Sequence, residues 1–139
     1  MIRAAACMFA LLAAPAFAAP PPMDSDDWRI MGPYKEWATS QHDLAGRWCC
    51  DIGDGRPVDA EIFENCNLPP GDVPDKCPAQ MPIGAHWWAH VTSEHWPDER
   101  DRWMMIPDEK ITSGINPIGV PILWLYQSRV QCFAPPDGP

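Results

Sequence analysis

Basic residues are scarce in this sequence of 139 residues. It holds 10 Lys and Arg against 19 Asp and Glu, which gives a formal net charge of −9 with the histidines neutral. Nucleic acids and anionic membranes are bound through clustered Lys and Arg, so this balance argues against both as partners. A basic protein or a cation suits the charge better, although acidity also serves simply to keep a domain soluble.

Long apolar runs are missing after the N-terminus, so no later segment is expected to span a membrane. The first eighteen residues have the pattern of a signal peptide. Arg3 precedes a short apolar stretch over residues 4–12, and Ala16-Phe17-Ala18 offers the small residues that a signal peptidase accepts. Cleavage is expected after Ala18, which predicts a periplasmic or secreted protein.

Removal of residues 1–18 would leave 121 residues, a length that suits one small domain, and the loss of Arg3 would bring the net charge to −10. Residues 19–32 are rich in proline and then acidic, and they are expected to form a disordered lead-in. Residues 33–139 are expected to form the domain. The sequence contains no internal repeat, and it does not predict an oligomeric state.

Known catalytic motifs are absent as well. The sequence has no G-x-S-x-G, no H-E-x-x-H and no phosphate-binding loop, and the neighbours Ser93, Glu94 and His95 form a string that arises often by chance. No C-x-x-C is present to support thiol exchange. A noncatalytic protein without a cofactor is therefore expected, with a small hydrolase or thiol enzyme as the least favoured alternative.

Five cysteines follow the predicted cleavage site, and an oxidising compartment would pair them. One bridge is expected between Cys66 and Cys77, which flank a stretch rich in proline. Cys132 is expected to pair with Cys49 or with Cys50, which would leave the other as a free thiol because adjacent cysteines rarely bond each other. Zinc is not favoured, since the spacing lacks the paired C-x-x-C of structural sites.

Glycine and proline recur too often after Cys49 for long helices, and short alternating runs predict strands over residues 58–63, 85–92, 102–106, 121–126 and 129–133. Gln127-Ser128 would turn the last two into a hairpin. A short helix is expected over residues 33–42, with Pro33 in its first turn. The predicted fold class is α+β, mainly β: a small antiparallel sheet of four or five strands with a short N-terminal helix, stabilised by disulfides.

Several short motifs resemble a group of small exported alphaproteobacterial proteins over residues 37–135: Trp48-Cys49-Cys50, Pro57-Val58, Asn116-Pro117-x-Gly119 and Cys132-Phe133-x-Pro135. In that group a third cysteine commonly follows the first pair, at a place where this sequence has Asp54-Gly55. Any bridge that this cysteine makes cannot be carried over. The resemblance implies export and a related fold rather than a chemical activity.

Three histidines within ten positions, His86, His90 and His95, suggest a metal-binding hypothesis. On a strand, His86 and His90 would share a face but lie about 13 to 14 Å apart, too far to bind one ion unless the strand bends. Histidines on a polar surface are the favoured interpretation. A periplasmic metal-binding protein that uses all three is the alternative.

Tryptophan is in excess, with eight residues in the chain. Trp87 and Trp88 must point to opposite faces of a strand, so Trp88 would share the face of His86 and His90. Exposed indoles stack on sugars or anchor protein contacts, while buried indoles would compensate for a core with little Leu and Phe. The favoured function is therefore an exported noncatalytic envelope protein that binds a glycan or a protein partner through an aromatic face. This function predicts that Trp88 or Trp96 is exposed beside a shallow groove.

Overall fold

The computed structural model describes residues 23–49, 55–64 and 84–138. Two short helices come first, α1 (Asp26–Met31) and α2 (Lys35–Thr39), joined by a 3-10 turn at Gly32–Tyr34. Ser25 caps α1, since its side-chain oxygen accepts from the Trp28 N–H at 3.1 Å. The helical region thus begins within the stretch expected to be a disordered lead-in, and the expected helix at 33–42 is divided into the 3-10 turn and α2.

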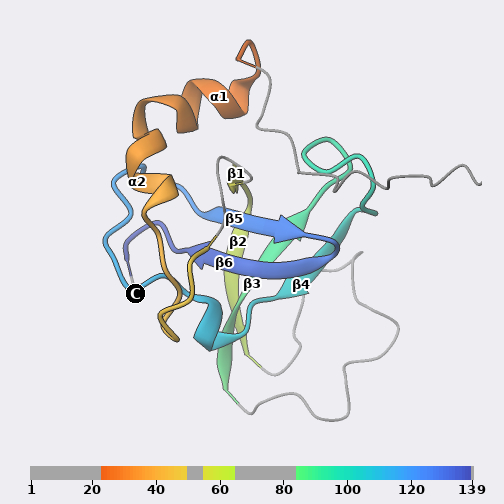
Figure 1. Ribbon diagram of the computed structural model, residues 1–139. Helices are drawn as coiled ribbons and strands as arrows, with labels where there is room; N and C mark the ends of the chain where they lie inside the picture. The colour runs from red at the N-terminus through yellow and green to blue at the C-terminus, as the bar shows by residue number, and fades with distance from the viewer. Residues whose placement is uncertain (1–22, 50–54, 65–83, 139) are drawn as a thin grey trace, which may run out of the picture.

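Six strands form two antiparallel sheets of three (Figure 1). The first sheet has the order β1-β5-β6, with β1 (Gly55–Pro57), β5 (Ile122–Tyr126) and β6 (Arg129–Ala134). The second has the order β2-β3-β4, with β2 (Ala60–Glu64), β3 (Ala85–Val91) and β4 (Arg102–Met105). The predicted class, α+β and mainly β with antiparallel strands, a short N-terminal helix and a disulfide, is confirmed.

The division into two sheets differs from the single sheet of four or five strands that was expected. It arises at Val58 and Asp59, which separate β1 from β2. One continuous stretch of chain therefore supplies an edge strand to each sheet. The short strand Gly55–Pro57 carries no apolar alternation in its sequence, so periodicity could not reveal it.

The two sheets and the helices form three layers. One core cluster lies between the helices and the first sheet, where Met31 and Ala38 meet Ile122, Trp124 and the disulfide. The opposite face of the first sheet packs against the second sheet in another cluster, made by Leu123, Leu125 and Phe133 with Ala89 and Val91 of β3. In Figure 1 the strands of the two sheets cross at a steep angle. The nearly continuous apolar run of β5 is explained by this position between two packed layers.

The hairpin between β5 and β6 forms as predicted. Tyr126 pairs with Arg129, so Gln127 and Ser128 are its two loop residues. Both have positive φ, 48° and 61°, as a type I′ turn requires. The Ser128 hydroxyl also donates to Glu99 at 2.7 Å, which joins this turn to the loop before β4.

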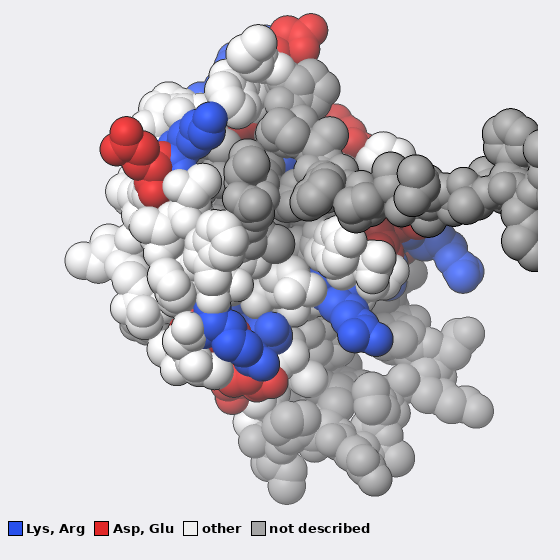
Figure 2. All heavy atoms as spheres, viewed as in Figure 1, with Lys and Arg blue, Asp and Glu red and all other residues white. Residues whose placement is uncertain are grey.

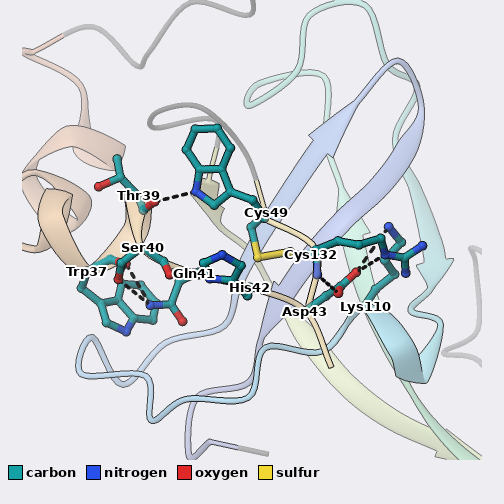
Figure 3. The surroundings of a disulfide bond; sticks show 11 residues. Trp37, Thr39, Ser40, Gln41, His42, Asp43, Cys49, Lys110 and Cys132 are labelled. Carbon is teal, nitrogen blue, oxygen red and sulfur yellow. Dashed lines mark hydrogen bonds and ion pairs between the residues drawn. A yellow bond between two sulfur atoms is a disulfide. The ribbon is translucent and has the colours of Figure 1, made fainter. Parts of the chain in front are cut away.

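A disulfide joins Cys49, in the segment after α2, to Cys132 of β6 (Figure 3). This pairing selects one of the two partners proposed for Cys132. The buried carboxylate of Asp43 lies beside it, where it accepts from the backbone N–H and the guanidinium of Arg47 at 2.9 and 2.8 Å. Cys50, Cys66 and Cys77 lie outside the described residues. Within the described ranges, no helix is long and apolar enough to cross a membrane.

Candidate functional site

A pocket of about 300 Å³ opens where α1, the junction of β1 with β2, and the end of β3 meet. Its walls are mostly apolar, with four polar side chains among them. They consist of Ile30, Pro57, Val58, Asp59, His90, Thr92, His95, Val120 and Pro121. This size and composition are typical of sites that bind small ligands or single side chains of a partner.

Backbone hydrogen bonds hold the walls of the pocket together. The Val58 N–H donates to the Pro121 carbonyl at 3.1 Å, and the His90 N–H donates to the Asp59 carbonyl at 2.8 Å. The side-chain amide of Asn116 donates to the carbonyl of Val120 at 2.7 Å and so fixes the loop that leads into β5. The pocket is thus built on the two sheets and on a loop that is tied to them.

Helix α1 is held against the pocket by the carboxylate of Asp27. Its Oδ2 lies 3.4 Å from Arg56 Nε of β1 and 3.4 Å from His95 Nδ1. The Arg56 side chain is only 10% exposed, so the pair lies in a partly dry environment where charge attraction is stronger than at the surface. Asp27 therefore places Ile30, one turn further along α1, on the pocket wall.

The loop that carries His95 is also ordered by hydrogen bonds. Asp101 accepts from the Ser93 N–H at 2.7 Å, and the hydrogen bonds from Ser93 lower the pKa of this exposed carboxyl below its ordinary value. The Trp96 N–H donates to the Thr92 carbonyl at 3.0 Å. Burial works to raise the pKa of Glu99, but its hydrogen bonds from Ser128 and Arg102 outweigh that effect and lower it.

The outer face of the second sheet is aromatic. His90 stacks on Trp103 with ring centroids 5.2 Å apart, and Phe63 meets Trp103 edge to face at 5.6 Å. Phe63 and Trp103 stand on the two strands that flank β3, about 10 Å apart, so both rings lean across β3. Phe63 pairs with His86, and Trp103 pairs with His90. Because Trp88 lies midway between these two histidines along β3, the two rings lie over Trp88.

The expectation that Trp88 is exposed is wrong, whereas Trp96 is partly exposed. Trp88 does share the face of His86 and His90, but it is only 3% exposed, and its indole N–H has no hydrogen-bond partner among the described residues. Trp96 is half-buried, packs against the core between the sheets and tilts against His95 at 5.8 Å. Trp48 is the exposed tryptophan at 52%, and its indole N–H donates to the Thr39 carbonyl at 2.7 Å.

The three histidines do not come together in the described structure. His86 is buried and its Nδ1 lies 3.1 Å from Asp108, while His90 and His95 line the pocket. No group of three or more metal-ligating side chains comes together in the part of the chain that the structure describes. His86 and His90 stand four residues apart on the strand β3, which keeps them apart as the strand spacing implied, and His95 contacts Asp27 instead.

Most residues of the pocket were not predicted. Pro57-Val58 and Asn116-Pro117-x-Gly119 were noted as motifs, and the structure uses them for the pocket wall and for the loop that carries Val120. No periodicity marks Asp59 or Thr92 as neighbours of His95, because the fold brings them together from separate segments. Neither a protein-family model nor a curated protein nor a solved structure matches this chain.

Proposed function

We propose that this chain is an exported, noncatalytic envelope protein that binds a partner through the pocket formed by α1, the β1–β2 junction and the end of β3. The pocket itself carries the proposal. Its volume of about 300 Å³ and its apolar walls with a few convergent polar groups favour recognition of a small group. Ile30 and Val120, both 37% exposed, extend the apolar surface to its rim.

The polar groups of the pocket support binding rather than catalysis. Nucleophilic catalysis needs a hydroxyl or thiol hydrogen-bonded to a base. The hydroxyl of Thr92 has no hydrogen-bond partner among the described residues, although two imidazoles line the same pocket. Ser93 is placed by its backbone hydrogen bond to Asp101 and does not line the pocket.

Export is supported by the N-terminal pattern of residues 1–18 and by the disulfide between Cys49 and Cys132. A covalent link of this kind persists in the periplasm or outside the cell and is rare in the cytosol. Partner binding in the envelope is consistent with both features. The aromatic face of the second sheet takes no part, because Trp88 is buried.

The test uses protein purified from the periplasm or medium after expression of the full-length chain. Soluble peptidoglycan fragments and a short lysine-rich peptide are titrated separately, and backbone amide resonances are followed by NMR. We expect at least one probe to shift amide resonances of residues 58–59, 90–95 and 120. Val120→Trp should fill the pocket and weaken that binding about tenfold, whereas Ile115→Trp, at an exposed position outside the pocket lining, should leave it unchanged.

If neither probe shifts the pocket resonances, the proposed function is wrong. It is equally wrong if binding occurs but Val120→Trp and Ile115→Trp affect it alike. Retention of the wild-type melting temperature in both variants would show that the comparison reports on binding and not on folding.

A further inference from the structure

We infer that the occupant of the pocket is a lysine or arginine side chain of a protein partner, bound with its aliphatic stem on the apolar wall and its charged end at Asp59. This inference rests on the proposed function and names the chemistry of the partner. Three properties of the pocket lead to it: the sign of its charge, the shape of its wall and the hydrogen-bonding groups inside it.

The charge of the pocket is negative. Asp59 lines it and is exposed to solvent, and neither lysine nor arginine occurs among the described residues that form its walls. The nearest basic group in the neighbouring strand is Arg56, whose guanidinium already lies 3.4 Å from Asp27 and is mostly buried. An incoming cation therefore meets an available carboxylate, whereas an incoming anion would meet Asp59 without a lysine or arginine in the wall to offset it.

The net charge of the whole chain also favours a cationic partner. A net charge of −9 attracts basic partners over distances longer than a contact and raises their rate of encounter. Acidic and basic side chains are interspersed over the described surface in Figure 2, without a broad basic region on that face. The specific part of recognition must therefore come from the pocket, with the overall charge favouring the approach.

The wall of the pocket suits an aliphatic stem. Ile30, Val58 and Val120 contribute branched apolar side chains, and Pro57 and Pro121 add rigid apolar surface. Lysine and arginine bury their methylene stems along such surfaces while the charged end stays near water or a carboxylate. Asp59 meets this requirement because it is both part of the lining and exposed.

The remaining polar groups can accept hydrogen bonds from a cation. The Thr92 hydroxyl offers two lone pairs and is without a hydrogen-bond partner in the described structure. The exposed carboxylate of Asp59 adds two acceptor oxygens to the same pocket. Ammonium and guanidinium groups carry only donors, so their hydrogen-bonding needs are complementary to this set.

A glycan is less well matched to the same pocket. Sugar rings are recognised largely by stacking on flat aromatic faces, and no tryptophan belongs to the described lining. Trp88 is buried, and Trp96 packs into the core. Binding of a sugar in this pocket is the alternative that the experiment must distinguish.

The experiment compares three acetylated and amidated hexapeptides that differ only at one central residue: lysine, norleucine or glutamate. Norleucine keeps the aliphatic stem and removes the charge. Each peptide is titrated at low ionic strength into the exported protein, and dissociation constants are taken from NMR shifts of pocket residues. A soluble chitooligosaccharide is titrated as the glycan probe. We expect the lysine peptide to bind most tightly and the glutamate peptide least.

Two matched variants identify the role of the carboxylate. Asp59→Asn keeps the size of the side chain and should weaken binding of the lysine peptide by about threefold to fivefold, the range expected for an exposed charge pair, without changing the norleucine peptide. Glu61→Gln removes the same charge from an exposed position on β2 outside the pocket, and should leave both peptides unchanged. Both substitutions are at exposed positions, so the fold is retained.

The outcomes separate this inference from the proposed function. Equal binding of lysine and norleucine peptides, or no effect of Asp59→Asn, overturns the cationic occupant but leaves a pocket that binds an apolar group. Binding of the chitooligosaccharide in place of the peptides also overturns it. If no peptide or sugar shifts the pocket resonances, and the peptidoglycan fragments also fail, both the inference and the proposed function are wrong.

Discussion

The side-chain amide of Asn116 donates to the backbone carbonyl of Pro135 at 2.9 Å, and so ties the loop before β5 to the residue that follows β6. The same amide donates to the Val120 carbonyl, and the Asn116 side-chain oxygen accepts from the Ile118 N–H at 3.0 Å. Asn116 is only 4% exposed. Two motifs that lie far apart in the sequence, Asn116-Pro117-x-Gly119 and Cys132-Phe133-x-Pro135, are therefore parts of one hydrogen-bonded unit.

Replacement of Asn116 by Ala should lower the free energy of unfolding by about 2 to 3 kcal/mol, because several buried backbone groups would lose their partner. Chemical denaturation measures this change. Gln131→Ala serves as the control, since the Gln131 amide makes only a long local contact of 3.4 Å with the Arg129 carbonyl. A loss for Asn116→Ala no larger than that of the control would contradict the structural role of Asn116.

Removal of the disulfide should cost about 4 kcal/mol of stability. The bridge between Cys49 and Cys132 closes a loop with a sequence separation of 83 residues, and the loss of chain entropy in the unfolded state increases with loop length. The double variant Cys49→Ala/Cys132→Ala removes the bridge without leaving an unpaired thiol at either position. Thermal unfolding of this variant and of the wild type, both without reductant, measures the difference. An unchanged melting temperature would show that the bridge adds nothing to stability.

The buried Asp43 predicts a stability that depends on pH. Burial works to raise the pKa of this carboxyl, but the hydrogen bonds and charge of Arg47, with the charge of Lys110, outweigh it and hold the pKa below its ordinary value of 3.8. The folded state therefore binds the proton less tightly than the unfolded state. The stabilisation is present above pH 3.8 and is lost as the pH falls through the lower pKa of the folded state.

Asp43→Asn measures this contribution. The variant should be less stable than the wild type by about 1 to 3 kcal/mol near neutral pH, because the ion pairs with Arg47 and Lys110 are lost. The difference between the two proteins should shrink as the pH falls below 3.8. Urea denaturation at a series of pH values follows it, and a difference that is constant or grows toward acid pH would contradict the role given to Asp43.

Gly55 in β1 is expected to tolerate no side chain. A Cβ at this position would lie 2.9 Å from the indole of Trp124 and 3.0 Å from Ile122, both of them fully buried. Gly55→Ala should therefore cost about 1 to 3 kcal/mol through overpacking. Gly114→Ala is the matched control, because a Cβ there meets its nearest described neighbour, Gln41, at an ordinary 3.6 Å. Similar stabilities of the two variants would show that the Trp124 side chain can move to accommodate the added methyl group.

Several elements could be predicted from the sequence because their signals are local. The alternation of residues 85–92 gave the strand β3 and both of its faces, and Gln127-Ser128 marked the β5–β6 hairpin. The strand expected over residues 121–126 corresponds to β5, the central strand of its sheet. The short strand β1 and the start of α1 were not predicted. Both segments are too short, and lack the apolar periodicity, to be recognised as a strand or a helix from the sequence.

The candidate site was harder to predict than the strands. His90 and His95 were singled out, but as metal ligands, and the pocket that they share with Asp59 and Thr92 draws on three separate parts of the chain. The exposure expected for Trp88 also failed. Whether an indole on a sheet face is buried depends on rings from the neighbouring strands. Sequence periodicity predicts the face of the strand on which a side chain lies, but it does not predict which side chains of other strands cover that face.

The sequence by itself determined the acidic charge, the mainly β character, which residues share a face of β3 and the late hairpin, because each depends on composition or on residues close together in the chain. Tertiary structure decided that the strands divide into two sheets, that Cys132 pairs with Cys49, that Trp88 is buried and that Asp59 lies beside His90 and His95. These outcomes depend on contacts between distant segments. Such contacts are selected by packing and hydrogen bonding in the folded chain, which no local pattern of residues encodes.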